Sequence, residues 1–142
     1  MRFADGFDSE QDVFACSLPG YRDAEPAPGS WDAAVEVLAE SIGRAVGEAP
    51  FVLVGYSTGG ALAHSLAARF EAAGVQPVGV VMIDTPMPDS EEEANSVFSS
   101  VMAQILGRES QAGVIADADW LTMGAYMRLL AEHTPPGSQP GA

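Results

Sequence analysis

The chain has very few positive charges. It carries 6 arginines and no lysine against 20 acidic residues, a formal net charge of −14 over 142 residues. A chain this acidic is repelled by nucleic acid and by anionic membranes. We therefore expect neither as a partner, and we interpret the acidity as a solubility feature.

Cysteine and histidine are also scarce. The single cysteine, Cys16, excludes an internal disulfide. It lies in a short apolar stretch, so we expect a buried, unreactive thiol. The two histidines, His64 and His133, are too far apart in sequence for a local metal site. The acidic run at residues 91–93 looks like the start of a helix, so we predict neither a metal nor a cofactor.

Long apolar runs are missing as well. No stretch approaches the length of a membrane span, and residues 1–6 lack the apolar region of a signal peptide. These features lead us to expect a cytoplasmic protein. With 47% apolar residues the chain has enough material for one domain with a core.

What the sequence does contain is an apolar run, Phe51–Val54, followed by G-x-S-x-G around Ser57 and then by a helix-forming stretch. This order predicts a nucleophile elbow, a sharp strand-to-helix turn that exposes the serine hydroxyl. Gly55 and Gly59 are expected where the strand and helix backbones pass closest. The alternative is a phosphate-cradling glycine turn, which the missing lysine and missing G-x-G-x-x-G disfavour.

The remaining elements of the first half fit around this turn. Apolar runs predict strands at residues 12–18, 51–54 and 78–84. Helical spacing predicts helices after Ser30, ending near Gly47, and over residues 61–73. The alternation predicts an α/β fold with a parallel sheet, in which strand 51–54 is covered on both faces.

After residue 88 two helices follow each other without a strand between them. The first begins at a capping box, Ser90 with Glu93, and the second begins near Asp119. We expect the second helix to bury one side, and the pair to form an inserted lid over the end of the sheet. The division is therefore a core at 1–88, a lid at 89–132 and a flexible tail at 133–142. The residues predicted on the buried side are Trp120, Met123, Met127 and Leu130.

Three residues are the main candidates for chemistry. Ser57 is the proposed nucleophile, and it needs a general base with an orienting carboxylate. Asp84 ends the next strand, at the same edge of a parallel sheet, so we expect it to be that carboxylate rather than a simple turn cap; Asp89 is a weaker candidate. The backbone N–H of Thr58 is expected in the oxyanion hole.

The general base is harder to assign. His64 lies seven residues after Ser57, about two helical turns away, and we interpret it as a packed or surface histidine. His133 closes the last helix, where it could complement the helix dipole. It could reach Ser57 only if that helix folds over the active edge.

At this point the sequence resembles the C-terminal thioesterase domains of modular type I polyketide synthases. The resemblance rests on Leu18-Pro19-Gly20-Tyr21, on residues 50–60 and 80–88, and on residues 121–130 in the lid. It implies an α/β-hydrolase fold in which Ser57 and Asp84 belong to a Ser-Asp-His triad. It also implies a polyketide acyl substrate, presented on the phosphopantetheine of an acyl carrier protein.

Two departures from that family follow from the same resemblance. Family members carry the triad histidine in a later Gly-Asp-His motif, and an earlier strand and loop that supply the first oxyanion donor. Neither is found in these 142 residues, so the chain resembles the central part of such a domain. Its sheet is expected to have a gap that leaves strand edges unpaired.

Three functions remain open at this stage. The first is a thioesterase that releases a polyketide by hydrolysis or macrolactonisation through an acyl-serine. The second is an inert truncated remnant, or an interaction module, that lacks the triad histidine. The third is a stand-alone editing thioesterase or an esterase of the same fold, because fold does not fix substrate.

Overall fold

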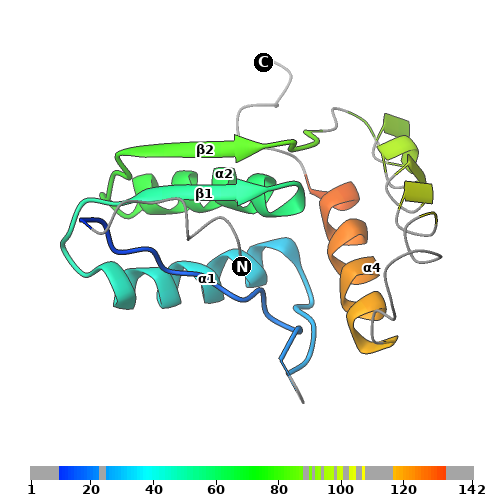
Figure 1. The fold of residues 1–142 in the computed structure, drawn as a ribbon, viewed down its shortest axis with the longest axis horizontal. Helices are drawn as coiled ribbons and strands as arrows, with labels where there is room; N and C mark the ends of the chain where they lie inside the picture. The colour runs from blue at the N-terminus through cyan, green and yellow to red at the C-terminus, as the bar shows by residue number, and fades with distance from the viewer. Residues whose placement is uncertain are drawn as a thin grey trace.

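The computed structural model describes residues 10–22, 25–87 and 117–133, together with scattered residues between 90 and 107. Its elements are α1 (Trp31–Val46), β1 (Val52–Tyr56), α2 (Thr58–Ala72), β2 (Gly79–Ile83) and α4 (Asp117–Glu132). Figure 1 shows α1 and α2 beside the two strands, and α4 beyond the arrowheads of the strands. The carboxyl ends of β1 and β2 therefore face α4.

The two strands form a parallel pair joined through α2. Val52 lies opposite Gly79 and Tyr56 opposite Ile83. A parallel connection needs a crossover element, and α2 supplies it. At its end, Gly74 N–H bonds to Glu71 C=O and Val75 N–H to Phe70 C=O, with Gly74 at a φ of 80°. This left-handed glycine cap confirms the expected end of the helix and turns the chain toward β2.

The first helix begins and ends where its sequence signals lie. Ser30 is the N-cap, and its hydroxyl accepts a hydrogen bond from the backbone N–H of Ala33 at 3.1 Å. Gly47, at a φ of 59°, follows the last helical residue. Val35 and Leu38, which lie on one side of α1, are buried, and Ile42 packs partly buried against the same core. This side of α1 faces α2. Glu36 of α1 also forms an ion pair with Arg69 of α2.

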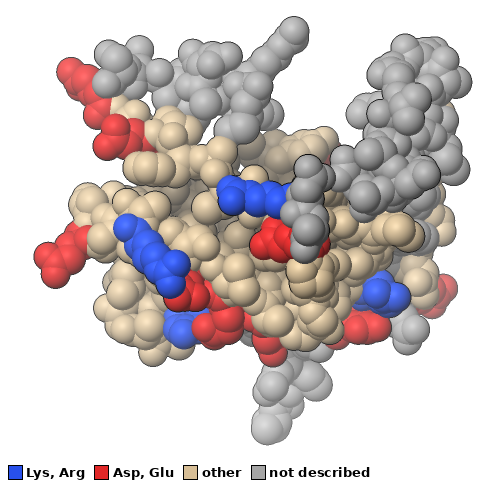
Figure 2. All heavy atoms as spheres, turned by 90° about the horizontal axis from the view of Figure 1, so that it is seen from below, with Lys and Arg blue, Asp and Glu red and all other residues tan. Residues whose placement is uncertain are grey.

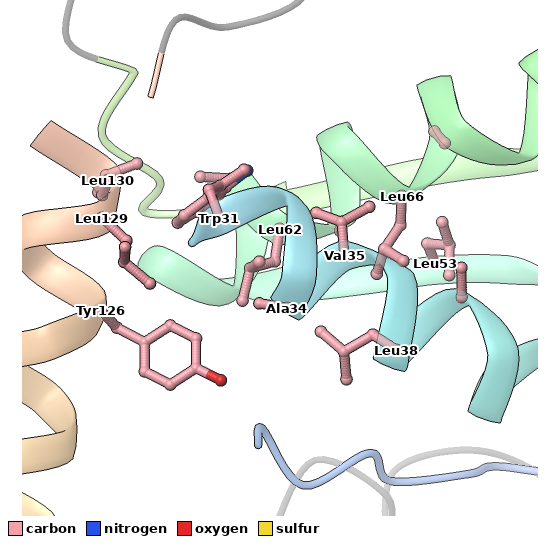
Figure 3. Close-up of a cluster of buried hydrophobic side chains, with 14 of the residues drawn as sticks. Trp31, Ala34, Val35, Leu38, Leu53, Leu62, Leu66, Tyr126, Leu129 and Leu130 are labelled. Atoms are coloured by element: carbon pink, nitrogen blue, oxygen red, sulfur yellow. The ribbon is translucent and has the colours of Figure 1, made fainter. Parts of the chain in front are cut away.

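One apolar core joins the three helices to the covered face of the sheet. Figure 3 shows Leu62 and Leu66 of α2 among side chains of α1, with Leu53 of β1 beside them. At the other end of the same cluster, Tyr126, Leu129 and Leu130 of α4 lie near Trp31. Burial of this continuous apolar surface is the main force that holds α4 to the α1–α2 pair.

The predicted strand at residues 12–18 is not present. These residues form no regular element, and 12–17 are exposed, including Phe14 at 63%. A strand is stable only when a neighbour pairs with its backbone, and within the described ranges β1 pairs with β2 alone. The expectation of a buried thiol fails for the same reason, because Cys16 is exposed.

The second correction concerns strand 51–54, which was expected to be covered on both faces. The strand is buried on one face only, where Leu53 and Gly55 meet α2. The opposite face is bare, with Val52, Val54 and Tyr56 each at least half exposed. No described helix lies on that side of the sheet (Figure 1). An all-apolar strand sequence indicated burial, but it could not show which elements supply the cover.

The region after residue 88 is only partly described. Ser90 accepts a hydrogen bond from the backbone N–H of Glu93 at 3.1 Å, as the capping box predicts, and the described residues between 92 and 107 are helical. The helix α4 starts two residues before Asp119. Met127 and Leu130 are buried as expected, whereas Met123 is only half-buried. Thr122, Tyr126 and Leu129 are buried too. The side chain of Trp120, Asp89 and the tail at 134–142 lie outside the described residues.

The charged side chains among the described residues lie at the surface. On the face shown in Figure 2, basic side chains lie beside acidic ones rather than in a patch of their own. Arg44 pairs with Glu40 one turn earlier on α1, and Arg69 with Glu36 across the two helices. Exposed pairs of this kind contribute less than about 1 kcal/mol each. Among the described helices, none is long and apolar enough to cross a membrane.

Candidate functional site

The turn between β1 and α2 holds Ser57 in a strained backbone conformation. Its φ of 54° and ψ of −125° lie where residues with a side chain are rarely found. The conformation is fixed from both sides, because Ser57 N–H donates to Ile83 C=O at 2.9 Å and Gly60 N–H donates to Ser57 C=O at 2.9 Å. The hydroxyl of Ser57 does not cap α2.

Two glycines make the turn sterically possible. A Cβ on Gly55 would lie 2.1 Å from the carbonyl oxygen of Gly59, so strand and helix backbones touch here. A Cβ on Gly60 would lie 1.8 Å from the Thr85 hydroxyl oxygen. Gly59 itself has open space around its Cβ position. The prediction for Gly55 is confirmed, whereas the second close approach occurs at Gly60 and not at Gly59.

Asp84 comes directly after β2 and lies at the same edge as Ser57. The register pairs Tyr56 with Ile83, so the residues that follow them are neighbours across the sheet. Asp84 has a φ of 47°, the second non-glycine residue of positive φ in the described chain, and its side chain is exposed. At the turn that follows, the Thr85 hydroxyl donates to Ile83 C=O at 3.3 Å. Two strained residues thus lie side by side at the carboxyl edge.

Thr58 links this edge to α4. It is the first residue of α2, so its backbone N–H is among the donors that have no partner within the helix. Its side-chain hydroxyl donates to the sulfur of Met127 at 3.5 Å. The position of Thr58 directly after the serine predicted its place in the oxyanion hole. The contact with Met127 could not be predicted from the sequence. Met127 is buried at this contact, with 7% of its surface exposed.

Among the described residues, neither histidine forms a hydrogen bond with Ser57. His64 lies on α2, about two turns from the serine, and its buried Nδ1 has no hydrogen-bond partner within the described structure. His133 instead packs at the end of α4 against α1. Its ring stacks on the indole of Trp31 with the ring centroids 4.8 Å apart. His64 is therefore packed in the structure, in line with its interpretation as a packed or surface histidine. His133 contacts Trp31, which the sequence did not indicate.

A buried serine joins these rings. The indole N–H of Trp31 donates to the hydroxyl oxygen of Ser65 at 2.9 Å, and Nε2 of His133 lies 3.3 Å from the same oxygen. Because Ser65 already accepts from Trp31, its own proton can be donated to an unprotonated Nε2. This arrangement holds His133 at the α1–α2 interface. No signal in the sequence links these three positions, which come from different helices.

Comparison with known proteins identifies the family of the chain. A family model described as thioesterase domain matches residues 2–119. The chain belongs to the thioesterase domain family. It is similar to Polyketide synthase GfsE of Streptomyces halstedii, with 37% identity over 140 residues, covering 94% of this chain. It is also similar to Erythronolide synthase EryA3 of Saccharopolyspora erythraea, with 34% identity over 123 residues, covering 87% of this chain.

A third polyketide synthase protein, NorC of the spectinabilin system of Streptomyces orinoci, is 40% identical over 89 residues, or 63% of this chain. The chain spans about 4% of the length of each of these three relatives. The resemblance to thioesterase regions of polyketide synthases is therefore confirmed. The partial α/β architecture, with a two-stranded parallel sheet, agrees with the fold of this family.

The environment of His133 in this thioesterase chain predicts a pH dependence of stability. Burial lowers the pKa of His133 and His64 lowers it further, while the Asp32 carboxylate opposes them in part. The unfolded chain then binds a proton at His133 more readily than the folded chain. The free energy of unfolding should therefore fall as the pH drops through about 6.5, and level off below the folded-state pKa.

Urea unfolding at a series of pH values between about 5.5 and 7.5 measures this effect around the ordinary histidine pKa. The His133→Asn variant is the control, and its stability should vary less with pH in that window. The same slope in both proteins would show that other groups cause it.

Proposed function

We propose that the turn at Ser57 is a nucleophile elbow and that the chain carries the nucleophile of a polyketide-releasing thioesterase. The observation that supports the proposal most strongly is the strained conformation of Ser57 at a turn that only small residues allow. An ordinary turn would not keep a residue with positive φ at this position without a compensating role. The chain's family and its polyketide synthase relatives supply the substrate class.

Each residue then has a defined part in the reaction. The hydroxyl oxygen of Ser57 attacks the thioester carbonyl while a general base removes its proton, and the tetrahedral oxyanion forms. The backbone N–H of Thr58 lies at the start of α2, where a helix N-terminus favours negative charge. Collapse of this intermediate, with the protonated base returning its proton to the sulfur, expels the thiol of the carrier's phosphopantetheine and leaves an acyl-serine. Water, or a hydroxyl of the acyl chain, then releases a free acid or a macrolactone.

Asp84 is the proposed carboxylate that orients the base. Its place beside Ser57 at the carboxyl edge suits this role. Neither histidine lies in a position to be the base: His133 is bound by Trp31 and Ser65, and His64 lies about two turns along α2 from Ser57. We therefore propose that a histidine other than these two, supplied from outside the 142 residues, takes the proton. The helix α4 borders the site and, with residues 90–107, would form the lid along the acyl chain.

A non-catalytic function is the second candidate. It is favoured by one observation, the sequestration of His133 away from Ser57. In that case the chain would act as an interaction module of a synthase, and the elbow would be an inherited feature. An editing thioesterase or esterase of the same fold would instead share the chemistry but not the substrate.

The functions are separated by measuring turnover of matched acyl substrates. A carrier-protein thioester, a short thioester of N-acetylcysteamine and the corresponding oxygen ester are incubated with the chain and with its Ser57→Ala variant, each in the presence of imidazole as an added general base. The proposal predicts serine-dependent release that is fastest from the carrier protein. Preference for the free thioester would indicate an editing enzyme, and preference for the oxygen ester an esterase. No serine-dependent release from any of the three would favour the interaction module.

A further inference from the structure

Two hydroxyl groups of α4 bind one short loop far away in the sequence. The Tyr126 hydroxyl donates to Pro19 C=O at 2.7 Å, and the Thr122 hydroxyl donates to Gly20 C=O at 3.0 Å. The two residues are four apart, so they lie on one side of the helix. Both are buried, with 2% and 7% of their surface exposed. Buried hydrogen bonds of this kind leave a carbonyl unsatisfied when the donor is removed.

The loop that receives these bonds is itself fixed. Gly20 has a φ of 99°, and a Cβ there would lie 2.9 Å from Ala27 Cα and 3.1 Å from the Thr122 methyl group. Its N–H donates to the Glu25 carboxylate at 3.2 Å. Tyr21 stacks on Tyr126, with the ring centroids 6.0 Å apart and the planes inclined by 21°. Residues 19–21 therefore form a rigid seat for α4.

The residue that follows Tyr126 faces the proposed nucleophile turn. Met127 accepts the Thr58 hydroxyl at its sulfur, and Thr58 is next to Ser57. Neighbouring residues on a helix point about 100° apart. Tyr126 therefore binds the loop at Pro19, while Met127 packs against the turn at Thr58. A small rotation of α4 that breaks the Tyr126 bond also withdraws Met127 from Thr58.

We propose that Tyr126 is a positioning residue: its bond to Pro19, supported by that of Thr122 to Gly20, holds Met127 against Thr58 beside Ser57. The inference rests on the proposed function only in taking Ser57 as the nucleophile. Residues 19–21 thereby determine the position of Met127, which lies beside the proposed oxyanion donor Thr58. This loop takes no part in the proposed chemistry.

The test is the rate of methionine oxidation by hydrogen peroxide, followed residue by residue with peptide mass spectrometry. Met127 is buried only while α4 is held against residues 19–21. Met82 is 44% exposed, so its oxidation rate measures the activity of the reagent in every variant. We expect Tyr126→Phe to raise the oxidation rate of Met127 about tenfold, because the Pro19 carbonyl loses its buried donor. Thr122→Val should raise it less, and Thr122→Ser, which keeps a hydroxyl, should restore the wild-type rate. Leu121→Ala, on the exposed side of α4, is the matched control and should change nothing.

The outcomes separate positioning from general stability. Rapid oxidation of Met127 with an unchanged Met82 rate and an unchanged circular dichroism spectrum supports the proposal. An unchanged Met127 rate in folded Tyr126→Phe overturns it, and so does equal acceleration in the Leu121→Ala control. If Tyr126→Phe does not fold, the comparison of Thr122→Val with Thr122→Ser gives the same decision. Because oxidation does not require a reactive Ser57, failure of the thioesterase proposal would leave this result unchanged.

Discussion

The Gly55→Ala variant is expected to lose about 3 kcal/mol or more of folding stability. Its methyl group would lie 2.1 Å from the carbonyl oxygen of Gly59 and 2.5 Å from the backbone nitrogen of Gly60. These neighbours are backbone atoms at the start of α2, so no side-chain rotation relieves the overlap. The strand and the helix must separate, which also displaces Ser57. Urea unfolding of the two proteins measures the difference.

Gly59→Ala is the matched control, four residues away in the same turn. No heavy atom lies within 4 Å of its Cβ position, and its φ is not positive. Alanine is the better helix former, so we expect its stability to equal or exceed that of the wild type by up to about 0.5 kcal/mol. Equal losses in both variants would mean that the close approach at Gly55 does not hold the turn together.

Replacing Ser57 by glycine is expected to stabilise the fold while removing all acylation. A serine at φ 54° and ψ −125° carries backbone strain, which costs about 1–3 kcal/mol at such positions. Glycine adopts this conformation freely but loses more entropy on folding, by about 0.5–1 kcal/mol. We therefore expect a net gain of about 1 kcal/mol. The hydroxyl makes no capping bond that would be lost.

Ser57→Ala separates strain from chemistry. Alanine has a Cβ and keeps the strain, so its stability should stay close to that of the wild type, and it lacks the hydroxyl as glycine does. Thermal or urea unfolding should rank glycine above both other residues, while acyl-adduct formation is lost in both variants. A glycine variant no more stable than the alanine variant would contradict stored strain at Ser57.

The local features around Ser57 could be predicted from the sequence because their causes are local. An apolar run, small residues at fixed spacing and a helix-forming stretch specify the strand, the turn and α2. Ser30 and Gly47 likewise mark the ends of α1. The place of Asp84 followed from the parallel order of two consecutive strands. The catalytic roles of Ser57, Thr58 and Asp84 are still predictions.

What the sequence did not show depends on contacts between distant segments. Residues 12–18 have the composition of a strand, but a strand forms only beside a partner. The exposed face of β1 could not be predicted. An apolar run is typical of a strand covered on both faces, but it does not show whether covering elements are present. The bonds of Thr122 and Tyr126 span 102 and 107 residues. The contacts of His133 with Trp31 and Ser65 likewise join the end of α4 to α1 and α2. No periodic pattern in the sequence predicts such contacts.

The central claim, that Ser57 is a nucleophile held by its turn, is tested most directly by the intact mass of the protein after exposure to a fluorophosphonate probe. Wild type and Ser57→Ala are compared with and without added imidazole, which can supply the missing base. The account predicts one adduct, on the wild type alone, that forms faster as the imidazole concentration rises. No adduct on folded wild-type protein at any imidazole concentration, or equal labelling of Ser57→Ala, would contradict it.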